Sequence, residues 1–396
     1  MTFGTLAVLV AAGMVGPLLA SVHRAAPPAV VGEILAGLII GASGLRWVDP
    51  ADPTLQSLAA VGFAMLMFVV GTHLPFRDPR LRPALGRGAL TTVTTAGLAL
   101  GAGWLIAPHL GLHRPLVLAV LLTASSAAVS LPLIQADRFE GSWQLVAISW
   151  IAIADVATVL AIPLVLSTGQ LGRAVTGTGI VLITAGAIYF VTIGLARRPV
   201  VLDVRAQSKA RGWALDLRTS LLVLFVLAWI ATRFGTSILI AGFSAGAVVS
   251  LVGEPRRVAQ QLIGVAEGFF VPLFFVDLGA RLDIRALLDD ARSIALAATL
   301  TVAATAVHVT AGRLWRVPLG PSLVATAQLG VPAAVASIGL QTGALRPAQA
   351  AAVMAAALGT LAICAIGSVM IGHSSVITDH AAPMDRSEDL GPEARA

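Results

Sequence analysis

Charged residues are scarce in this chain. Aspartate, glutamate, lysine and arginine make up 12% of its 396 residues, whereas 57% of the residues are hydrophobic and the mean hydropathy is +0.90. Because soluble globular proteins carry roughly 25% charged residues, this composition excludes an ordinary soluble domain. It predicts instead a polytopic membrane protein, since each crossing of a bilayer needs a long apolar segment.

Cysteine and lysine are almost absent. The single cysteine, Cys364, excludes a disulfide within the chain and a metal cluster built on thiolates. The single lysine is Lys209, and the arginines are scattered instead of forming a patch, so we expect no nucleic-acid partner. The metalloprotease motif H-E-x-x-H and the Walker loop are also absent. We therefore expect a protein that is not an enzyme, that needs no cofactor and that is not driven by ATP.

Apolar segments recur along the whole chain, each with the roughly 20 residues that a helix needs to cross a bilayer. They predict an all-α fold with about thirteen transmembrane helices. The first segment follows no basic residues and precedes no small-residue cleavage site, so we interpret it as a span and not as a signal peptide. The predicted spans are residues 3–22, 28–45, 56–74, 88–108, 115–135, 143–167, 174–196, 217–234, 236–252, 260–280, 293–314, 320–341 and 348–372.

The loops between these spans predict the orientation of the chain. Most of the 26 basic residues fall in loops on the side of the C-terminus, above all in residues 75–87 and 197–218. Because cytoplasmic loops are rich in lysine and arginine, we expect the N-terminus outside and the C-terminus in the cytoplasm of a bacterial inner membrane. The polar tail, residues 373–396, is too short for a domain, and we expect it to be disordered, with no nucleotide-binding domain attached.

Two pairs of similar segments indicate an internal repeat. Residues 71–77 (GTHLPFR) match residues 279–285 (GARLDIR) at an offset of 208, and Gly37 matches Gly246 at an offset of 209. The members of each pair lie seven spans apart, and an odd number inverts the second copy across the membrane. Inverted repeats around a site at the midplane are typical of secondary transporters. Chance similarity between glycine-rich membrane helices is the alternative interpretation.

Asp155 is the first candidate for a functional site. It is the only charged residue in the apolar segment Trp143–Leu166, near the middle of a predicted span. An ionised, unpaired carboxylate at that depth costs at least several kcal/mol, so intramembrane acidic residues usually bind a cation, carry a proton or do both. A protonated aspartate that is hydrogen-bonded to a neighbouring helix is the structural alternative.

Small polar residues and prolines interrupt two other predicted spans near their middles. This pattern is typical of a helix that is broken within the membrane, where freed carbonyl groups and helix ends face a cavity that can bind a cation. Ordinary helix packing through serine and glycine is the alternative. The residues are Thr123, Ser125, Ser126, Ser130 and Pro132 in span 115–135, and Thr326, Gln328, Gly330 and Pro332 in span 320–341.

Further ionisable residues lie in apolar surroundings. Glu33 is near the predicted cytoplasmic end of its span, and Glu267 is about two turns inside span 260–280. His308 is the one titratable group in the interior of span 293–314. We keep these three as accessory candidates for ion transport, with structural roles as the alternative. Asp277 lies near the end of span 260–280 and is followed by Arg281.

Four segments resemble the monovalent cation:proton antiporters, specifically the branch that contains the Kef-type and sodium/proton exchangers. The segment PPAVVGEILAGLIIGASGL is similar to that family's P-x-V-x-G-E-x-x-A-G-x-x-x-G-P-S-G-L, with Ala42 where proline is usual. Span 56–74 ends like the family's F-x-x-G-x-x-L. The segment ASSAAVSLPLI resembles S-S-T-A-V-V-L-P-L-L, with Ala127 in place of threonine, and FFVPLFFVDLGARLDI resembles F-x-P-x-F-F-x-x-x-G-x-x-L-D.

This resemblance covers residues 3–372 and implies a sodium/proton antiporter-like fold, in which two broken helices cross beside an ion-binding aspartate. In this chain the aspartate is Asp155, and we expect it to bind the alkali cation together with Thr123, Ser125, Ser126 and Gln328. The resemblance also implies a homodimer whose transmembrane domain, residues 1–372, has three parts. They are a scaffold (about 3–74 and 217–280), a moving core (about 88–167 and 293–372) and a linker helix (about 174–196).

Two positions depart from the family pattern. Ala154 precedes Asp155 where the family commonly has Asn, Asp or Gln, and the interior of span 293–314 offers only His308 where the family has Lys or Arg. The loss of paired charges predicts an electroneutral exchange of one Na⁺ or K⁺ for one proton by alternating access. The alternatives, which Ala154 favours, are an antiporter-like protein that exports another solute in exchange for protons, and a membrane-bound sensor.

Overall fold

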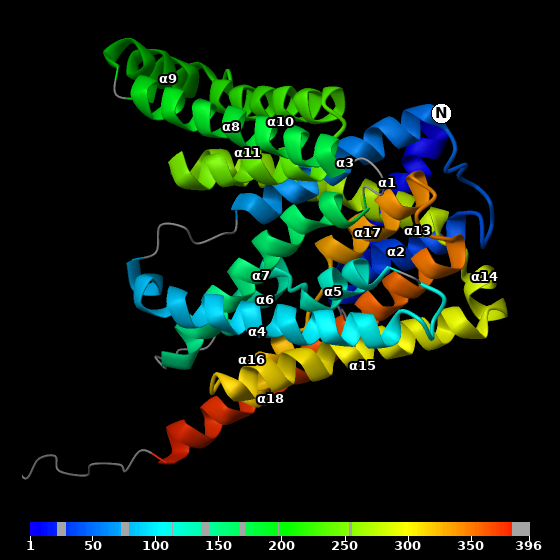
Figure 1. Ribbon diagram of the computed structural model, residues 1–396. Coiled ribbons are helices and arrows are strands. Elements are labelled where there is room, and N and C mark those ends of the chain that lie inside the picture. Colours follow the sequence, from blue (N-terminus) through cyan, green and yellow to red (C-terminus); the bar gives the residue numbers. More distant parts are fainter. Residues whose placement is uncertain are drawn as a thin grey trace, which may run out of the picture.

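A computed structural model describes residues 1–21, 29–72, 79–112, 114–135, 142–166, 171–196, 198–252 and 256–381. Within these ranges every regular element is a helix. Most of the longer helices run roughly along one direction and pack side by side (Figure 1). The predicted all-α fold class is therefore confirmed.

The order of the helices follows the order of the predicted spans. The element η1 is a single 3-10 turn, and η2 is a π-helical turn between α12 and α13. The elements are α1 (Phe3–Ser21), α2 (Ala29–Ile40), α3 (Pro53–Thr72), η1 (Pro79–Leu81), α4 (Arg82–Ile106), α5 (Pro115–Thr123), α6 (Ala127–Gln135), α7 (Ser142–Leu166), α8 (Leu171–Ala196), α9 (Pro199–Arg211), α10 (Leu215–Arg233), α11 (Ile238–Val252), α12 (Arg256–Val265), η2 (Ala266–Phe270), α13 (Val271–Arg281), α14 (Ile284–Asp289), α15 (Ala291–Leu314), α16 (Leu319–Val324), α17 (Gly330–Gln341) and α18 (Pro347–Ala381).

The described helices are of the length and composition that membrane spans require. Nine of them are long and apolar enough to cross a membrane, and four shorter apolar segments, among them α2 and α11, accompany them in the described part of the chain. Each predicted span therefore has an apolar helix or a pair of short helices in its place. The number of membrane crossings itself stays a prediction.

Three segments differ from the prediction. The predicted loop 197–218 contains the helix α9, whose polar sequence does not have the hydropathy of a span. The helix α2 ends at Ile40, short of the predicted end at residue 45, because Gly41 and Gly44 follow it. The helix α18 continues to Ala381 because no proline interrupts the segment that we expected to be a disordered tail. Residues 382–396 of that tail lie outside the described residues.

The two copies of the predicted repeat pack in matching ways. Gly37 of α2 packs against the backbone of Val276 in α13, and Gly246 of α11 packs against the backbone of Phe68 in α3. A Cβ atom at either glycine would collide with a carbonyl oxygen, so these close approaches require glycine. Because α2 corresponds to α11 and α3 to α13, the two interfaces are the same contact in the two copies. Residues 73–77 of the other repeat motif lie outside the described residues.

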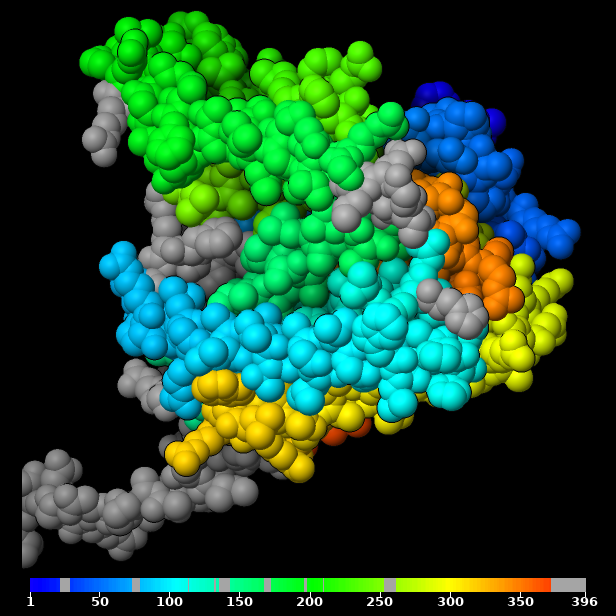
Figure 2. Space-filling model, viewed as in Figure 1, coloured from blue at the N-terminus to red at the C-terminus, as the bar shows by residue number. Residues whose placement is uncertain are grey.

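The helices pack in two sets. One set contains α1, α2, α3, α11 and α13, and the other contains α4, α5, α7, α15, α16 and α18. The helix α8 packs against α10 and α11. On the face shown in Figure 2, α7 lies between the helices α8–α10 and the helices α4–α5. The short helices α6 and α17 contact both α7 and α3, so they lie where the two sets meet.

Candidate ion-binding site

Two of the predicted spans are broken in their middles, as the sequence predicted. The helix α5 ends at Thr123, and the extended backbone of Ala124, with ψ of 139°, separates it from α6. In the second broken span, residues 325–329 separate α16 from α17. Pro332 lies in the first turn of α17, where the missing N–H of a proline costs no helical hydrogen bond.

The two breaks lie against each other and are joined by hydrogen bonds. The backbone N–H of Ser126 donates to the carbonyl oxygen of Ala327 at 2.7 Å. The hydroxyl group of Ser125 donates to the carbonyl oxygen of Ala325, also at 2.7 Å. The interrupted backbone of each span therefore satisfies part of the hydrogen-bonding need of the other, which allows both breaks to be buried.

Asp155 lies at this crossing. Its side chain is 4% exposed, and its Oδ2 atom accepts a hydrogen bond of 3.0 Å from the backbone N–H of Ala127, the first residue of α6. The N-terminus of a helix carries partial positive charge and free N–H groups, so this end of α6 favours a carboxylate. The structure thus brings the aspartate of α7 to the broken span that the sequence predicted.

Asp155 has no basic partner among the described residues. No lysine, arginine or histidine nitrogen in that part of the chain lies within 4.0 Å of its carboxylate. The preceding residue, Ala154, is fully buried and offers only its carbonyl oxygen, which accepts a hydrogen bond from Thr158 at 2.7 Å. A cation that enters here therefore meets one carboxylate whose charge no neighbouring side chain neutralises.

Neutral oxygen atoms surround the breaks. The hydroxyl group of Thr123 donates a hydrogen bond of 2.7 Å to the carbonyl oxygen of Ala119, and the hydroxyl group of Ser125 donates to that of Ala325. Each hydroxyl oxygen keeps lone pairs that can coordinate a cation. Gln328 is 5% exposed, and its Nε2 atom has no hydrogen-bond partner. A buried amide nitrogen without a partner is costly, so Gln328 is the polar side chain of this break that the described structure leaves least satisfied.

His308 forms no ion pair with Asp155 within 4.0 Å in the described part of the chain. Its ring is fully buried, its Nδ1 atom lies 2.9 Å from the carbonyl oxygen of Ala304, and it stacks on the indole of Trp150 with ring centroids 5.5 Å apart. The Nε2 atom of His308 and the Nε1 atom of Trp150 have no hydrogen-bond partner. Sequence reasoning did not single out Trp150, because an apolar aromatic residue in an apolar helix gives no signal of such a contact.

The two glutamates lie on other elements. Glu33 of α2 is 5% exposed and lies against Gly16 of α1, and Glu267 belongs to η2. Their elements pack mainly against α1, α3, α12 and α13 instead of the broken helices. The π-helical turn at Glu267 had no sequence signal.

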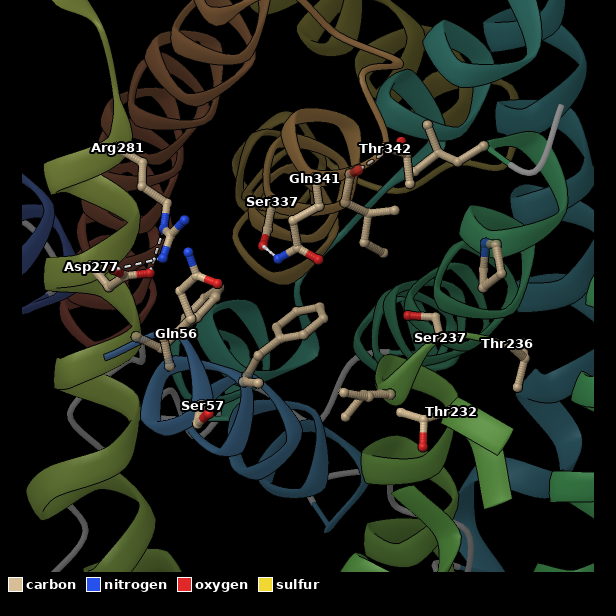
Figure 3. A pocket seen from close by; sticks show the side chains of 18 of the residues that line it. Gln56, Ser57, Thr232, Thr236, Ser237, Asp277, Arg281, Ser337, Gln341 and Thr342 are labelled. Atoms are coloured by element: carbon tan, nitrogen blue, oxygen red, sulfur yellow. Dashed lines mark hydrogen bonds and ion pairs between the residues drawn. The ribbon is translucent and has the colours of Figure 1, made fainter. Parts of the chain in front are cut away.

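A cavity of about 900 Å³ lies between the two helix sets. Phe63 of α3 and Pro163 of α7 line it. Asp277 of α13 and Ser337 of α17, which lies where the two sets meet, line it as well (Figure 3). Asp155 itself does not line the cavity, and it precedes Pro163 on α7 by about 12 Å at the helical rise of 1.5 Å per residue. The cavity therefore lies at the C-terminal end of α7, beyond Asp155 along the chain.

One serine motif has a structural explanation. Residues 242–246 (GFSAG) have the spacing of the G-x-S-x-G motif, which in hydrolases forms a sharp turn between a strand and a helix. Here they lie within the helix α11, and the described residues contain no strand, so these residues form no such turn. The small residues instead allow α11 to pack closely on α3.

Several known proteins are similar to this chain in sequence. YjbQ of Bacillus subtilis is 28% identical over 305 residues, and the Na⁺/H⁺ antiporter of Enterococcus hirae is 24% identical over 268 residues. The glutathione-regulated potassium-efflux system protein KefC of Salmonella arizonae is 27% identical over 279 residues. These matches cover 72%, 65% and 67% of this chain, and 48%, 67% and 43% of the respective relatives. The chain thus spans about half the length of YjbQ and of KefC.

The fold is also that of a solved antiporter. The structure of the sodium proton antiporter MjNhaP1 from Methanocaldococcus jannaschii at pH 8 matches with a TM-score of 0.61 and 16% sequence identity. The match covers 94% of this chain and 98% of that one, so the sodium/proton antiporter-like fold is confirmed. Residues 8–374 match the sequence profile of the family described as "Sodium/hydrogen exchanger, transmembrane". This chain therefore belongs to the sodium/hydrogen exchanger family of membrane transporters.

Proposed function

We propose that this chain exchanges Na⁺ or K⁺ for protons across the inner membrane by alternating access, and that Asp155 binds the two ions in turn. One observation carries the proposal. The Asp155 carboxylate is buried at the N-terminus of α6, beside two crossed helix breaks, without a basic partner in the described residues.

Competition at Asp155 couples the two fluxes. Apolar surroundings make an ionised and unpaired carboxylate costly, so the side chain stays occupied by a proton or by a cation. A single carboxylate does not hold both at once. Oxygen atoms of Thr123, Ser125, Ser126 and Gln328, together with carbonyl groups at the breaks, would replace the hydration water of the cation.

Movement of one helix set against the other would give alternating access. In this proposal a core (about 88–167 and 293–372) carries Asp155 and the broken helices, a scaffold (about 3–74 and 217–280) stays in place, and α8 links them. The separate packing of the two sets supports this division, and so does the position of the cavity between them. The closely packed glycine contacts of α2, α3, α11 and α13 would keep the scaffold rigid.

The names of the relatives support a monovalent cation. The Enterococcus hirae protein is named for Na⁺ and H⁺, and KefC is named for potassium efflux. We propose an electroneutral exchange of one cation for one proton, because Asp155 is the one ionisable group at the crossing of the described helices. We further propose that the protein works as a homodimer in the bacterial inner membrane, with its N-terminus outside.

Transport by the purified protein tests this function. Liposomes that contain the protein and a trapped pH-sensitive dye are given NaCl, KCl or LiCl, with choline chloride at the same ionic strength as the control. We expect the internal pH to change on addition of Na⁺ or K⁺ and to stay constant with choline. If no alkali cation moves protons, the proposed exchange is wrong, and a solute/proton antiporter or a membrane-bound sensor becomes the better interpretation.

A further inference from the structure

Asp277 and Arg281 form a two-point ion pair on the wall of the cavity. The Nε atom of Arg281 donates to Oδ2 of Asp277 at 2.7 Å, and its Nη2 atom donates to Oδ1 at 3.1 Å. The Asp277 side chain is 6% exposed, whereas the Arg281 side chain is 23% exposed. The carboxylate is thus nearly buried in the wall, and the guanidinium group is the more exposed member of the pair.

This pair carries all of the ionisable charge among the described residues that line the cavity. The other polar lining groups are neutral amides and hydroxyls (Figure 3), namely Gln56, Ser57, Thr232, Thr236, Ser237, Ser337, Gln341 and Thr342. The balance between one carboxylate and one guanidinium therefore sets the electrostatic potential that an entering ion meets. With both charges present, the cavity is close to neutral.

The cavity lies at one end of two helices, α7 and α17, that lead to the candidate site. Phe63 and Phe274, which stack with ring centroids 5.1 Å apart, line the cavity on the side of α3 and α13. On the other side, α7 leads from Pro163 toward Asp155, and α17 leads from Ser337 toward the break that contains Gln328. A charge on this wall acts on every cation that takes this route.

We propose that the Asp277–Arg281 pair sets the potential of this cavity and thereby the affinity for the alkali cation at this mouth of the transporter. Asp277 attracts cations, and Arg281 offsets that attraction, so the pair keeps the affinity lower than the carboxylate alone would give. The proposal rests on the cation/proton exchange proposed above. The alternative is a purely structural pair, since Arg281 is the last residue of α13 and a cation there also stabilises the helix end.

A thiol reporter measures the potential without any need for transport. Ser57 is exposed and lines the cavity, whereas the natural cysteine, Cys364, is 2% exposed, so Ser57→Cys adds one accessible thiol. The rates of its reaction with a cationic and an anionic methanethiosulfonate of similar size are compared. Adding Arg281→Gln should raise the cationic-to-anionic rate ratio, adding Asp277→Asn should lower it, each by about threefold to tenfold, and the double change should restore it.

The apparent KM for the cation provides the second measurement. It is determined at constant ionic strength on vesicles in which the protein is inserted in one orientation and on vesicles in which it is inserted in the other. Arg281→Gln should lower KM and Asp277→Asn should raise it, each by about threefold or more, on the cavity side alone. The double variant should return to the wild-type KM. Matched controls are Arg346→Gln and Asp290→Asn, which change an ion pair 3.9 Å long that does not line the cavity. Arg281→Lys should keep the wild-type values.

The outcomes separate the two proposals. Unchanged rate ratios, or a KM that changes equally on both faces, would overturn the role of the pair. Shifted thiol rate ratios with an unchanged KM would also overturn this role, and so would variants that lose thermal stability and change neither the ratios nor the KM. A wild-type protein that exchanges no alkali cation would instead overturn the proposed function, and the thiol ratios would still decide whether the pair sets the potential.

Discussion

The Oδ2 atom of Asp155 accepts a hydrogen bond of 3.0 Å from the backbone N–H of Ala127. This contact joins α7 to the first turn of α6, so the carboxylate sits at the positive end of a half-helix. A helix end stabilises negative charge only in part, which leaves the carboxylate able to bind a proton or a small cation. In the proposed mechanism, the binding of either ion would depend on the geometry of the broken span.

We expect Asp155→Asn to abolish exchange while the protein still inserts and folds. Asparagine has nearly the same shape, and its Oδ1 atom can still accept the hydrogen bond from Ala127, but it cannot ionise. The rate of cation-driven proton movement in liposomes is the measurement, with thermal stability in detergent as the check on folding. Asp290→Asn serves as the control, because an asparagine there keeps the cap of α15. Wild-type exchange by the Asp155 variant would defeat the site assignment.

We expect Gln328→Ala to weaken the apparent cation affinity more than the maximal rate. Loss of one neutral ligand or hydrogen bond, at about 1 kcal/mol, corresponds to roughly a fivefold rise in KM. The matched control is Gln349→Ala. Gln349 is also buried, but it bonds the N–H of Arg346 and the carbonyl oxygen of Gly111, so its loss should lower stability and leave KM unchanged. If a cation titration gives the same KM for the Gln328 variant and the wild type, Gln328 does not contribute to cation binding and has only a packing role.

Hydropathy and residue type were enough to predict the apolar helices, the two breaks and the carboxylate near them. Asp155 and Ser125 carry side-chain signals, because charge and hydroxyl groups are rare in apolar spans. The partners of these side chains could not be predicted. Ala127, Ala325 and Ala327 contribute backbone N–H and carbonyl groups, which every residue has, and only the fold decides which of them meet.

Long-range contacts between apolar residues were equally hidden. The stacking of His308 on Trp150 joins residues 158 positions apart, and neither the hydropathy nor the residue types predict such a contact. The helix α9 was missed because its residues lack the apolar run of a span. In contrast, the paired glycines of the repeat could be predicted, since Gly37 and Gly246 are separated by nearly the same number of residues as the two other repeat segments.

The repeat predicts which glycines the fold requires. We expect Gly246→Val to lower the free energy of unfolding by about 1–3 kcal/mol, and with it the melting temperature, because the added side chain would collide with the backbone of Phe68. Gly97 of α4 gives the matched control. It is exposed, a Cβ atom there meets nothing within 4 Å, and Gly97→Ala should be neutral or stabilising by up to about 1 kcal/mol. Equal melting temperatures for the Gly246 variant and the wild type would contradict the close contact of α11 with α3.

The last prediction is that exchange is electroneutral. Ala154 is apolar and Asp155 has no basic partner within 4.0 Å in the described residues, so the charge at the crossing can change by only one unit. One bound cation then replaces one bound proton, and the loaded core has the same charge in both directions. A membrane potential acts on the net charge that is moved, at about 2.3 kcal/mol per elementary charge per 100 mV. We therefore expect exchange rates in liposomes to follow the two chemical gradients and to ignore a clamped potential.

His308 decides the interpretation if this expectation fails. Rates that rise or fall steeply with the clamped potential would show that a second charge moves with the core. His308 is the one group in the interior of α15 that could supply it, since histidine is the side chain that ordinarily titrates near neutral pH. In that case His308→Ala should abolish the dependence on potential while exchange continues. Its ring stacks on Trp150, so His308→Phe, which keeps the stack without a titratable nitrogen, should give the same loss of voltage dependence with a smaller loss of stability.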